Sequence, residues 1–260
     1  MPSMDPAEYS DPLIAAARHA GNAILAVRAK GLDVREKADR SPVTEADETA
    51  EQIILAVLDE ITPAIPVVAE ESVARDGAPE VGAPWFWLVD PLDGTKEFIA
   101  GRDEFTVNIA LIEDGSPIMG IVYLPALDEL YLGIPGRGAW RQQRDDTTSQ
   151  AIAVRHPPAE GLTVLASRSH RTPEVDAYLE HLTVAGLRAV GSSLKFCVLA
   201  SGGADLYPRF GRTMEWDTAA GDAVLRAAGG RVETIDGAPM RYAKRGFANP
   251  DFIARGAAAE

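Results

Sequence analysis

Acidic residues follow two apolar segments of this sequence, at positions where their carboxylates could meet. Glu70 follows the apolar residues 65–69, and Asp90 and Asp93 stand at the end of a second apolar run, 85–89. Both runs are typical of β-strands, and ligands of α/β sheets bind at strand ends. Carboxylates that converge repel one another unless protons or cations bridge them, and all-oxygen sites favour hard ions such as Mg²⁺. The pattern therefore predicts a metal site.

The residues that follow Asp93 could bind a phosphate group beside that metal site. If a helix begins after Gly94, its first N–H groups face the same crevice and can bind phosphate oxygens. Gly94 lets the backbone approach a ligand closely, and the hydroxyl of Thr95 could orient a water. Two ions that share carboxylates are the usual arrangement for moving phosphoryl groups. A plain strand-to-helix turn explains the short D-x-D-G-T motif equally well, so both interpretations stay open here.

A third acidic position, Asp217, lies far along the chain. It precedes the alanine-rich segment 218–227, whose apolar residues recur at helical spacing. As a single residue, Asp217 is explained best as a helix N-cap. The functional alternative is that Asp217 completes the metal site from the second half of the chain.

Several cationic residues in the second half could bind an anionic ligand. Lys195 could bind a phosphate through its ammonium while Ser192 or Ser193 donates a hydrogen bond. Arg209 could bind one with a bidentate fork. Arg168 and His170 could flank a sugar or a second phosphate. Taken one at a time, each of these side chains is explained better as a solvated surface residue.

Composition narrows the class of protein. The chain has 260 residues, and 25 Lys+Arg against 39 Asp+Glu give a net charge of −14, which argues against general nucleic-acid binding. The single cysteine, Cys197, excludes an internal disulfide or a Cys-rich zinc site and fits a reducing compartment. No apolar run approaches the ~20 residues of a membrane span, and residues 1–12 lack the features of a signal peptide. We therefore expect a cytoplasmic globular protein, and a peripheral contact with a membrane stays open.

The elements that must position these residues are helices first, then a mixed sheet, then an α/β alternation. Apolar periodicity predicts helices over 12–30 and 44–61, the second with Asp47 placed as in a capping box after Thr44. Turn signals between apolar runs predict an antiparallel meander over 104–142. In the second half, strands are predicted at 163–166, 187–190, 204–207 and 231–235, and helices at 173–182, 193–200 and 218–227. Residues 72–84, rich in Gly, Pro and charge, are predicted to form a loop.

Three of these motifs together closely resemble the inositol monophosphatase superfamily, a group of Mg²⁺-dependent, lithium-sensitive phosphatases. They are EES at 70–72, DPLDGT at 90–95 and WDTAAG at 216–221. The resemblance runs from about residue 13 to 253 and is thinnest over 143–160. It implies an α+β fold, a layered α-β-α-β-α sandwich of the inositol monophosphatase and fructose-1,6-bisphosphatase type. We expect one unit of two sub-domains, 1–148 with most metal ligands and 149–260 with Asp217 and the residues that select the substrate.

Further segments resemble one branch of this superfamily, the CysQ-like 3'(2'),5'-bisphosphate nucleotidases. They are SPVTEAD at 41–47, DGTKEF at 93–98, ASRSH at 166–170, GSSLKFC at 191–197 and the segment 204–221. The branch removes the 3'-phosphate of adenosine 3',5'-bisphosphate to give AMP and phosphate, in sulfur assimilation and nucleotide recycling. An inositol or fructose phosphate phosphatase, and a non-catalytic protein that senses a nucleotide, remain alternatives. A homodimer is also open.

The resemblance implies a ligand set for the metal ions. Glu70, Asp90 and the carbonyl of Leu92 would hold one Mg²⁺, and Asp90, Asp93 and Asp217 would hold a second. Glu70 would also reach a third ion through water.

The resemblance implies catalytic and substrate contacts as well. Asp47 and Thr95 would position and deprotonate the attacking water, with Glu70 beside them, while the backbone at Gly94 and Thr95 receives the scissile phosphate. The residues expected to contact substrate are Asp93, Gly94, Thr95, Lys96, Arg168, His170, Ser192, Lys195, Arg209 and Asp217.

Overall fold

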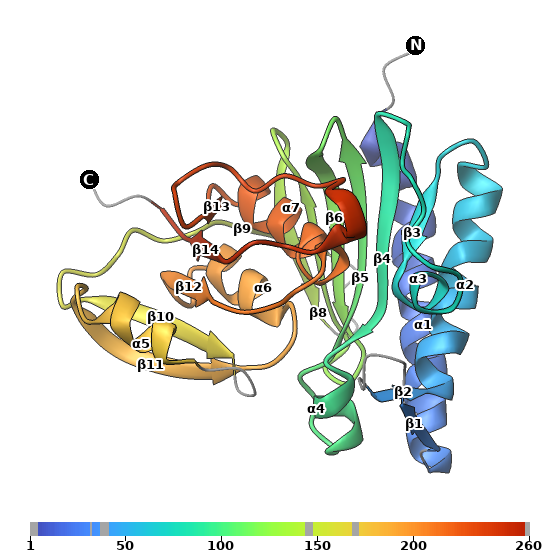
Figure 1. Cartoon of the computed structure of the whole chain (residues 1–260), viewed down its shortest axis with the longest axis horizontal. Coiled ribbons are helices and arrows are strands. Elements are labelled where there is room, and N and C mark those ends of the chain that lie inside the picture. Colours follow the sequence, from blue (N-terminus) through green and yellow to red (C-terminus); the bar gives the residue numbers. More distant parts are fainter. Residues whose placement is uncertain (1–4, 32, 37–41, 144–147, 168–171, 258–260) are drawn as a thin grey trace.

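The computed structural model stacks helices and two large sheets in alternating layers (Figure 1). The layers are helices α1 (Ser10–Lys30) and α2 (Glu45–Ile61), a seven-stranded sheet, helices α6 (Leu194–Ala200) and α7 (Ala219–Ala227), a five-stranded sheet, and helix α5 (Pro173–Leu179). This order confirms the predicted layered α-β-α-β-α sandwich. The structure describes residues 5–31, 33–36, 42–143, 148–167 and 172–257. Within these ranges, no helix combines the length and the apolar composition that a membrane span requires.

The predicted end of α1 and start of α2 are confirmed, whereas α1 begins at Ser10 after the N-cap residue Tyr9, so the interpretation of Asp11 as its N-cap is wrong. α1 ends at Gly31, whose φ of +101° is open to glycine at little cost. At the start of α2, the Thr44 hydroxyl accepts from the N–H of Ala46 (3.1 Å), and Asp47 Oδ2 accepts from the N–H of Thr44 (2.8 Å). The predicted capping box therefore forms, and it fixes the Asp47 carboxylate at the beginning of α2.

The seven-stranded sheet confirms the predicted meander. Its strands, in spatial order, are β3 (Val67–Ala69), β4 (Trp85–Asp93), β5 (Thr106–Glu113), β6 (Ser116–Leu124), β7 (Glu129–Ile134), β8 (Gly138–Gln143) and β9 (Gln150–Ile152). Only the β3–β4 pair is parallel, and the other neighbours are antiparallel. Along β4, Trp87 packs toward α1 and α2 while Phe86 packs toward the middle layer. Burial on both faces explains why this strand is apolar throughout.

The five-stranded sheet lies on the other side of α6 and α7 (Figure 1). Its spatial order is β11 (Val184–Val190), β10 (Leu162–Ser167), β12 (Leu206–Arg209), β14 (Phe252–Arg255) and β13 (Arg231–Thr234). α5 covers its outer face, where Tyr178 and Leu179 pack against Val164, Leu206 and Ile253. β12 ends at Arg209, so the strand delivers this side chain to the region between the two sheets.

Two glycines let α7 lie directly on the seven-stranded sheet. A Cβ atom at Gly120 would come within 2.3 Å of the carbonyl oxygen of Ala220, and one at Gly133 within 2.3 Å of the Cα atom of Val224. Close-packed protein interiors do not tolerate such contacts, so only glycine fits at these two positions. The helix therefore presses on β6 and β7, which holds the turn before α7 near β4 and β5.

Several segments differ from the sequence prediction. Residues 70–76 form helix α3 (Glu70–Asp76), so the preceding strand ends at Ala69 and the loop predicted over 72–84 is wrong at its start. Strands β1 (Val34–Glu36), β2 (Pro42–Thr44), β9 and β14 were not predicted. Each has only three or four residues, too few to show a periodicity, and each depends on hydrogen bonds from a partner strand. The division of the chain at residue 148 stays a prediction, and β9, just beyond it, pairs with β8.

Candidate active site

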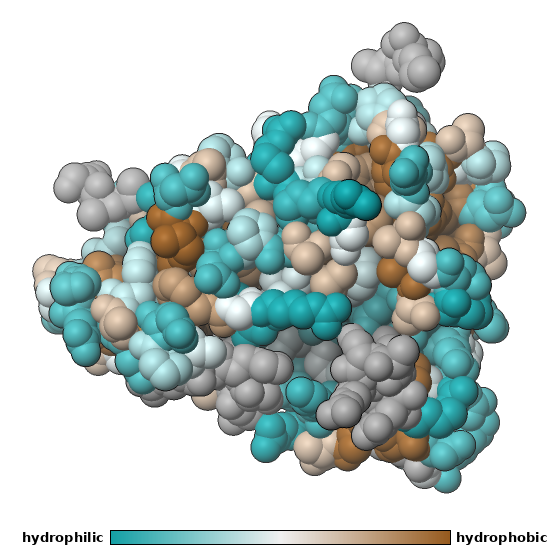
Figure 2. All heavy atoms as spheres, in the orientation of Figure 1, coloured by the Kyte–Doolittle hydropathy of each residue, from teal (hydrophilic) through white to brown (hydrophobic). Residues whose placement is uncertain are grey.

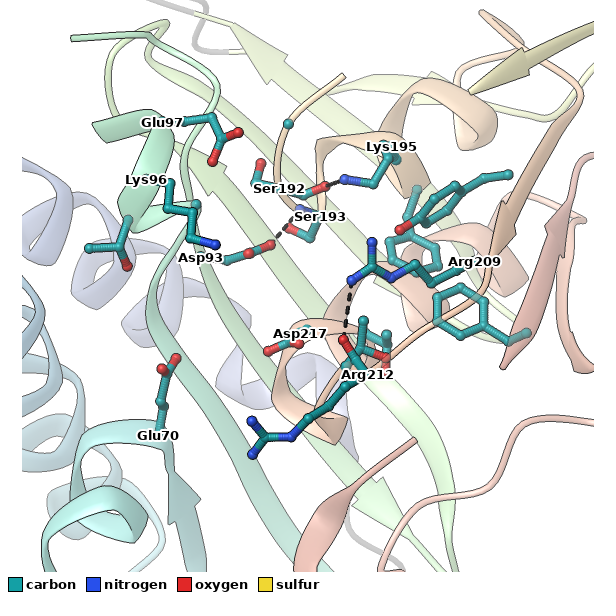
Figure 3. Close-up of a pocket in the computed structure, with 18 residues that line it drawn as sticks. Glu70, Asp93, Lys96, Glu97, Ser192, Ser193, Lys195, Arg209, Arg212 and Asp217 are labelled. Atoms are coloured by element: carbon teal, nitrogen blue, oxygen red, sulfur yellow. Dashed lines mark hydrogen bonds between the residues drawn. The ribbon is translucent and has the colours of Figure 1, made fainter. Parts of the chain in front are cut away.

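A pocket of ≈ 260 Å³ opens where the end of β4 meets segments from the second half of the chain (Figure 3). Helix α4 (Thr95–Ile99) borders it on one side, and α6, β12 and the 3-10 turn η2 (Glu215–Asp217) border it on the other. Hydrophilic and weakly apolar side chains lie side by side in the middle of the face drawn in Figure 2. The predicted site residues that line the pocket are Glu70, Asp93, Gly94, Thr95, Lys96, Ser192, Lys195, Arg209 and Asp217.

Acidic side chains from three elements surround one end of the pocket, which we call the acidic end (Figure 3). Glu70 is the first residue of α3, Asp93 the last of β4 and Asp217 the last of η2. The N–H of Ser193 donates to Asp93 Oδ2 (2.5 Å), and the N–H of Met214 donates to Asp217 Oδ2 (2.8 Å). Each bond fixes one carboxylate oxygen, so both carboxyl groups have a defined orientation in the pocket wall.

The electrostatics of the acidic end favour a bound cation. Removal from solvent raises the pKa of the Asp93 carboxyl to about 6, and the negative charge of Glu70 contributes to this rise. Removal from solvent and repulsion by Asp93 and Glu70 raise the pKa of Asp217 well above its ordinary value. Among the residues that the structure describes, no three acidic, His or Cys side chains already enclose an ion position. The oxygen donors and their mutual repulsion nevertheless fit a hard divalent ion, which would draw them together.

Asp90 and Leu92 lie beneath the pocket rather than in its lining. Asp90 is buried, and its Oδ1 accepts from the N–H of Leu92 (3.0 Å). This bond turns the chain within the DPLDGT motif. Gly94 completes the turn with a φ of +90°, and a Cβ atom there would lie 3.1 Å from the carbonyl oxygen of Glu104. α4 begins directly afterwards at Thr95, which confirms the predicted helix start.

A hydrogen-bonded chain of side chains joins the pocket to the start of α2. The Thr95 hydroxyl lies 3.3 Å from Asp47 Oδ1 and 3.2 Å from the carbonyl oxygen of Leu92, and it can donate to either. Asp47 Oδ2 accepts from the hydroxyl of Thr44 and from its N–H, both at 2.8 Å. A Thr95 hydroxyl that donates to Asp47 keeps its oxygen as an acceptor for a water in the pocket. This pair therefore has the geometry to orient a water and to receive its proton.

Two buried cations occupy the opposite, cationic end of the pocket. Lys195 is 5% exposed, and its Nζ donates to the carbonyl oxygen of Ser192 (2.5 Å) and lies 5.1 Å from the centre of the Tyr207 ring. Burial lowers the pKa of this ammonium to about 8, against the opposing charge of Asp93. Arg209 is 7% exposed, and while one Nη donates to a carbonyl oxygen, its buried Nε finds no acceptor among the described residues. A buried donor without a partner is costly, which favours an anionic ligand here.

Comparison with known proteins places this geometry in a family. A model of the inositol monophosphatase family matches residues 5–259. The chain belongs to the inositol monophosphatase family. The resemblance seen in the three sequence motifs is thereby confirmed.

Individual relatives extend the similarity over nearly the whole chain. A protein of Escherichia coli O157:H7 named 3'(2'),5'-bisphosphate nucleotidase CysQ is 47% identical over 247 residues, 93% of this chain and 97% of that protein. The crystal structure of CysQ from Bacteroides thetaiotaomicron has a TM-score of 0.79 and 39% identity, and covers 96% of this chain and 97% of its own. An IMPase from Thermotoga maritima has a TM-score of 0.78 at 25% identity, covering 97% and 92% of the two chains.

Both serines of the GSS segment line the pocket, and the hydroxyl of Ser193 is bound by other residues of the protein. The Ser193 hydroxyl is buried, donates to Asn108 Oδ1 (2.7 Å) and pairs with the hydroxyl of Thr106 (2.8 Å). Its N–H holds Asp93, as described above. Ser193 thus ties the second half of the chain to β5. Its neighbour Ser192 adopts a φ of +45°, which is unusual for serine. Arg168 and His170 lie outside the described residues.

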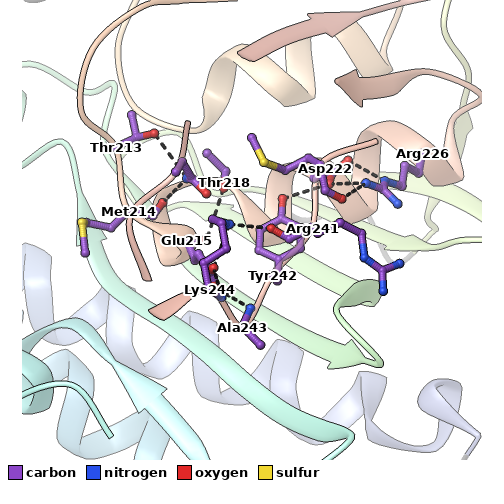
Figure 4. A network of polar contacts seen from close by, with 12 residues as sticks. Thr213, Met214, Glu215, Thr218, Asp222, Arg226, Arg241, Tyr242, Ala243 and Lys244 are labelled. Atoms are coloured by element: carbon purple, nitrogen blue, oxygen red, sulfur yellow. Dashed lines mark hydrogen bonds and ion pairs between the residues drawn. The ribbon is translucent and has the colours of Figure 1, made fainter. Parts of the chain in front are cut away.

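A polar network fixes the turn that carries Asp217 (Figure 4). Glu215 is fully buried, and its carboxylate accepts from the N–H groups of Ala243 and Lys244, both at 2.8 Å, and pairs with the Lys244 ammonium at 2.7 Å. Thr218, not Asp217, is the N-cap residue of α7, so the simple N-cap interpretation of Asp217 is wrong. Asp217 instead closes the η2 turn by accepting from the N–H of Met214, which leaves it directed at the pocket.

Sequence reasoning missed some residues of the pocket wall. Arg212 lines the pocket, and its carbonyl oxygen accepts from Arg209 Nη2 (3.1 Å). Tyr207 and Phe252 line it as well, with their rings packed edge to face. The signal that could have pointed to Arg212 is its place in the sequence, three residues after the predicted site residue Arg209. Residues this close along the chain often lie in the same turn.

Proposed function

We propose that this protein hydrolyses the 3'-phosphate of adenosine 3',5'-bisphosphate to AMP and phosphate with the help of Mg²⁺. The observation that carries this proposal is a pocket with carboxylates at one end and two buried cations at the other. A substrate with two phosphates needs one anion site for the phosphate that reacts and another for the phosphate that stays on the nucleotide. The near full-length similarity to proteins named 3'(2'),5'-bisphosphate nucleotidase supports the same substrate.

The metal ions are assigned to the residues at and beneath the acidic end. We assign Glu70, Asp90 and the Leu92 carbonyl to one ion, Asp90, Asp93 and Asp217 to a second, and a water-mediated contact of Glu70 to a third. When bound, such ions neutralise phosphate charge and lower the pKa of a bound water. The raised carboxyl pKa values of the metal-free site support this assignment.

The nucleophile is assigned to a water held by Thr95, with Glu70 beside it. The Thr95 hydroxyl donates to Asp47, so its oxygen accepts one proton of the water and turns the water lone pair toward phosphorus. As the new P–O bond forms, the water proton passes to Thr95 Oγ1 and the Thr95 proton passes to Asp47 Oδ1. The bond from phosphorus to the ribose 3'-oxygen breaks, and this oxygen takes up a proton from a solvent water as AMP leaves.

Substrate recognition is assigned mainly to the cationic end. The backbone at Gly94 and Thr95 receives the reacting phosphate beside Asp93 and Asp217. Lys195 and Arg209 bind the second phosphate, with Ser192 donating a further hydrogen bond. Lys96, Arg168 and His170 complete the predicted substrate contacts. This division gives the sub-domain 1–148 most of the metal ligands and 149–260 the residues that select the substrate.

Phosphate release from a small substrate panel tests the proposed function. The panel contains adenosine 3',5'-bisphosphate, AMP, inositol 1-phosphate and fructose 1,6-bisphosphate, each with Mg²⁺, with EDTA and with lithium. We expect strong preference for the bisphosphate nucleotide and loss of activity with EDTA or lithium. Preference for inositol or fructose phosphate would keep the metal site and contradict the roles of Lys195 and Arg209. Binding of the nucleotide without turnover would favour a sensor protein instead. Location in the cytoplasm and a homodimer remain predictions.

A further inference from the structure

One buried acid near the pocket has no place in the mechanism above. Glu51 lies on α2, one turn after Asp47, is 3% exposed and does not line the pocket. Its Oε2 accepts from the N–H of Glu71 (2.7 Å), and its Oε1 accepts from the hydroxyl of Ser72 (2.6 Å). Both donors belong to the first turn of α3. A side chain of one helix thus contacts the beginning of another.

These contacts replace a cap that α3 lacks. The N-cap residue of α3 is Ala69, whose side chain has no acceptor, although the first N–H groups of a helix need partners. A helix of seven residues is too short to be stable by itself. Glu51 supplies the missing acceptor from α2. Burial raises the pKa of this carboxyl, and the hydrogen bonds from Ser72 and Glu71 oppose the rise, so the charged form depends on α3.

The capped turn begins with a residue of the acidic end. Glu70 is the first residue of α3 and directly precedes the two residues that Glu51 holds. Asp47 and Glu51 are four residues apart, so they share one face of α2. From this face Asp47 contacts Thr95 and Glu51 contacts the turn of Glu70. One rigid helix therefore sets the position of Glu70 relative to Thr95.

We propose that Glu51 is a positioning residue, which caps α3 from α2 and thereby holds Glu70 where it can bind the metal ion. The inference rests on the metal site of the proposed function and holds for any phosphate ester substrate. Other buried acids of the chain have different partners. Asp205 is bonded by two nitrogens of Arg155, and Asp222 by two nitrogens of Arg226. Neither of these contacts a segment that carries a proposed metal ligand.

Direct binding of Mn²⁺, measured without substrate from the electron paramagnetic resonance signal of the free ion, tests this inference. Glu51→Gln keeps the size of the side chain but turns an N–H donor toward the donors of α3. We expect its Mn²⁺ affinity to fall about 10-fold to 100-fold, the usual effect of losing a residue that orients a ligand. Asp205→Asn is the matched control, because it neutralises a buried acid that does not line the pocket and is bound by Arg155, and it should bind Mn²⁺ like the wild type.

Ser72→Ala is a milder variant that removes only one donor to Glu51, and it should weaken Mn²⁺ binding severalfold with little change in the thermal midpoint. If Glu51→Gln does not unfold cooperatively in EDTA, this variant is not properly folded, and the Mn²⁺ affinity of Ser72→Ala alone tests the positioning role of Glu51. Unchanged Mn²⁺ affinity in the folded variants, or an equal loss in Asp205→Asn, overturns the positioning role. A wild-type protein that does not bind Mn²⁺ overturns the metal site as well, so the two failures are distinguishable.

Discussion

The two ends of the pocket differ in how the protein stabilises their buried charges: the acidic end leaves like charges facing one another, and the cationic end surrounds its charge with partners. At the acidic end, Asp93 and Asp217 repel each other and Glu70, and both carboxyl pKa values are raised. At the cationic end, carbonyl oxygens and the Tyr207 ring surround Lys195. We therefore expect the acidic end to reach its working geometry only with a divalent ion. The cationic end is expected to keep its shape without a ligand, because the protein itself supplies most partners.

The largest expected effect comes from removing one carboxylate of the acidic end. Asp93→Asn should lower kcat about 10³-fold or more, because a proposed metal ligand loses its charge. The same change removes repulsion, so the thermal midpoint in EDTA should equal or exceed that of the wild type. Phosphate release and thermal unfolding measure the two effects. Near-normal turnover in this variant would refute the two-metal scheme, and a large loss of stability in EDTA would contradict the repulsion argument.

The next largest effect should come from Thr95, and it distinguishes the role of this residue in proton transfer from the role of the carboxylates in metal binding. Thr95→Ala should lower kcat about 10²-fold to 10⁴-fold, the range of general acid–base catalysis, while Mn²⁺ affinity stays close to wild type. Thr95→Ser keeps the hydroxyl and should restore most of the rate. Steady-state kinetics at saturating Mg²⁺ give the comparison. Equal rates for the alanine and serine variants would show that the hydroxyl has no role in the chemical step.

At the cationic end, removing the charge of Lys195 should change the binding of different substrates more than the rate of the chemical step. Lys195→Met keeps the bulk of the side chain and removes a charged hydrogen bond worth about 1.5–3 kcal/mol. We expect KM for adenosine 3',5'-bisphosphate to rise about 10-fold to 100-fold, with a much smaller change for inositol 1-phosphate. The exposed Lys30 offers a control, Lys30→Met, which should leave both substrates unaffected. Equal losses on both substrates would mean that Lys195 does not select the nucleotide.

The smallest expected effect is a pH dependence that distinguishes the two ends. The raised pKa of Asp93 means that this group stabilises the metal-free fold at low pH and loses that contribution as pH rises through about 6. Mg²⁺ competes with protons for the same oxygens, so it should raise the thermal midpoint at pH 7.5 by a few degrees more than at pH 5. Scanning calorimetry with and without Mg²⁺ measures this difference. An equal shift at both values would disagree with a titrating acidic end.

Lys195 gives the corresponding prediction for the cationic end. Its pKa of about 8 lies below the ordinary value, so the ammonium loses its proton as pH rises through about 8. KM for the bisphosphate should therefore rise above pH 8 while that for inositol 1-phosphate changes little. Lys195→Met should abolish this rise, and a rise that persists in the variant would assign the titration to another group.

The chain's local features were predictable where neighbours in sequence determine them. The capping box of Thr44 and Asp47, the turn at Gly94 and the start of α4 all follow from bonds between residues a few positions apart. The helix α3 was missed, because its first turn is capped by Glu51 from another helix. Ser193 shows the same limit, since only packing reveals that its hydroxyl binds Asn108.

The sequence by itself determined the family, the layered α+β fold and the acidic residues that gather at the pocket. It could do so because strand and helix periodicity, turn chemistry and three spaced motifs are encoded by residues close together along the chain. Only the tertiary structure decided how charge is distributed around the pocket. It placed Lys195 and Arg209 beneath the surface, Asp217 opposite Glu70 and Glu51 behind α3. Burial and desolvation, which set the pKa of each group, depend on packing between distant segments and have no local signature.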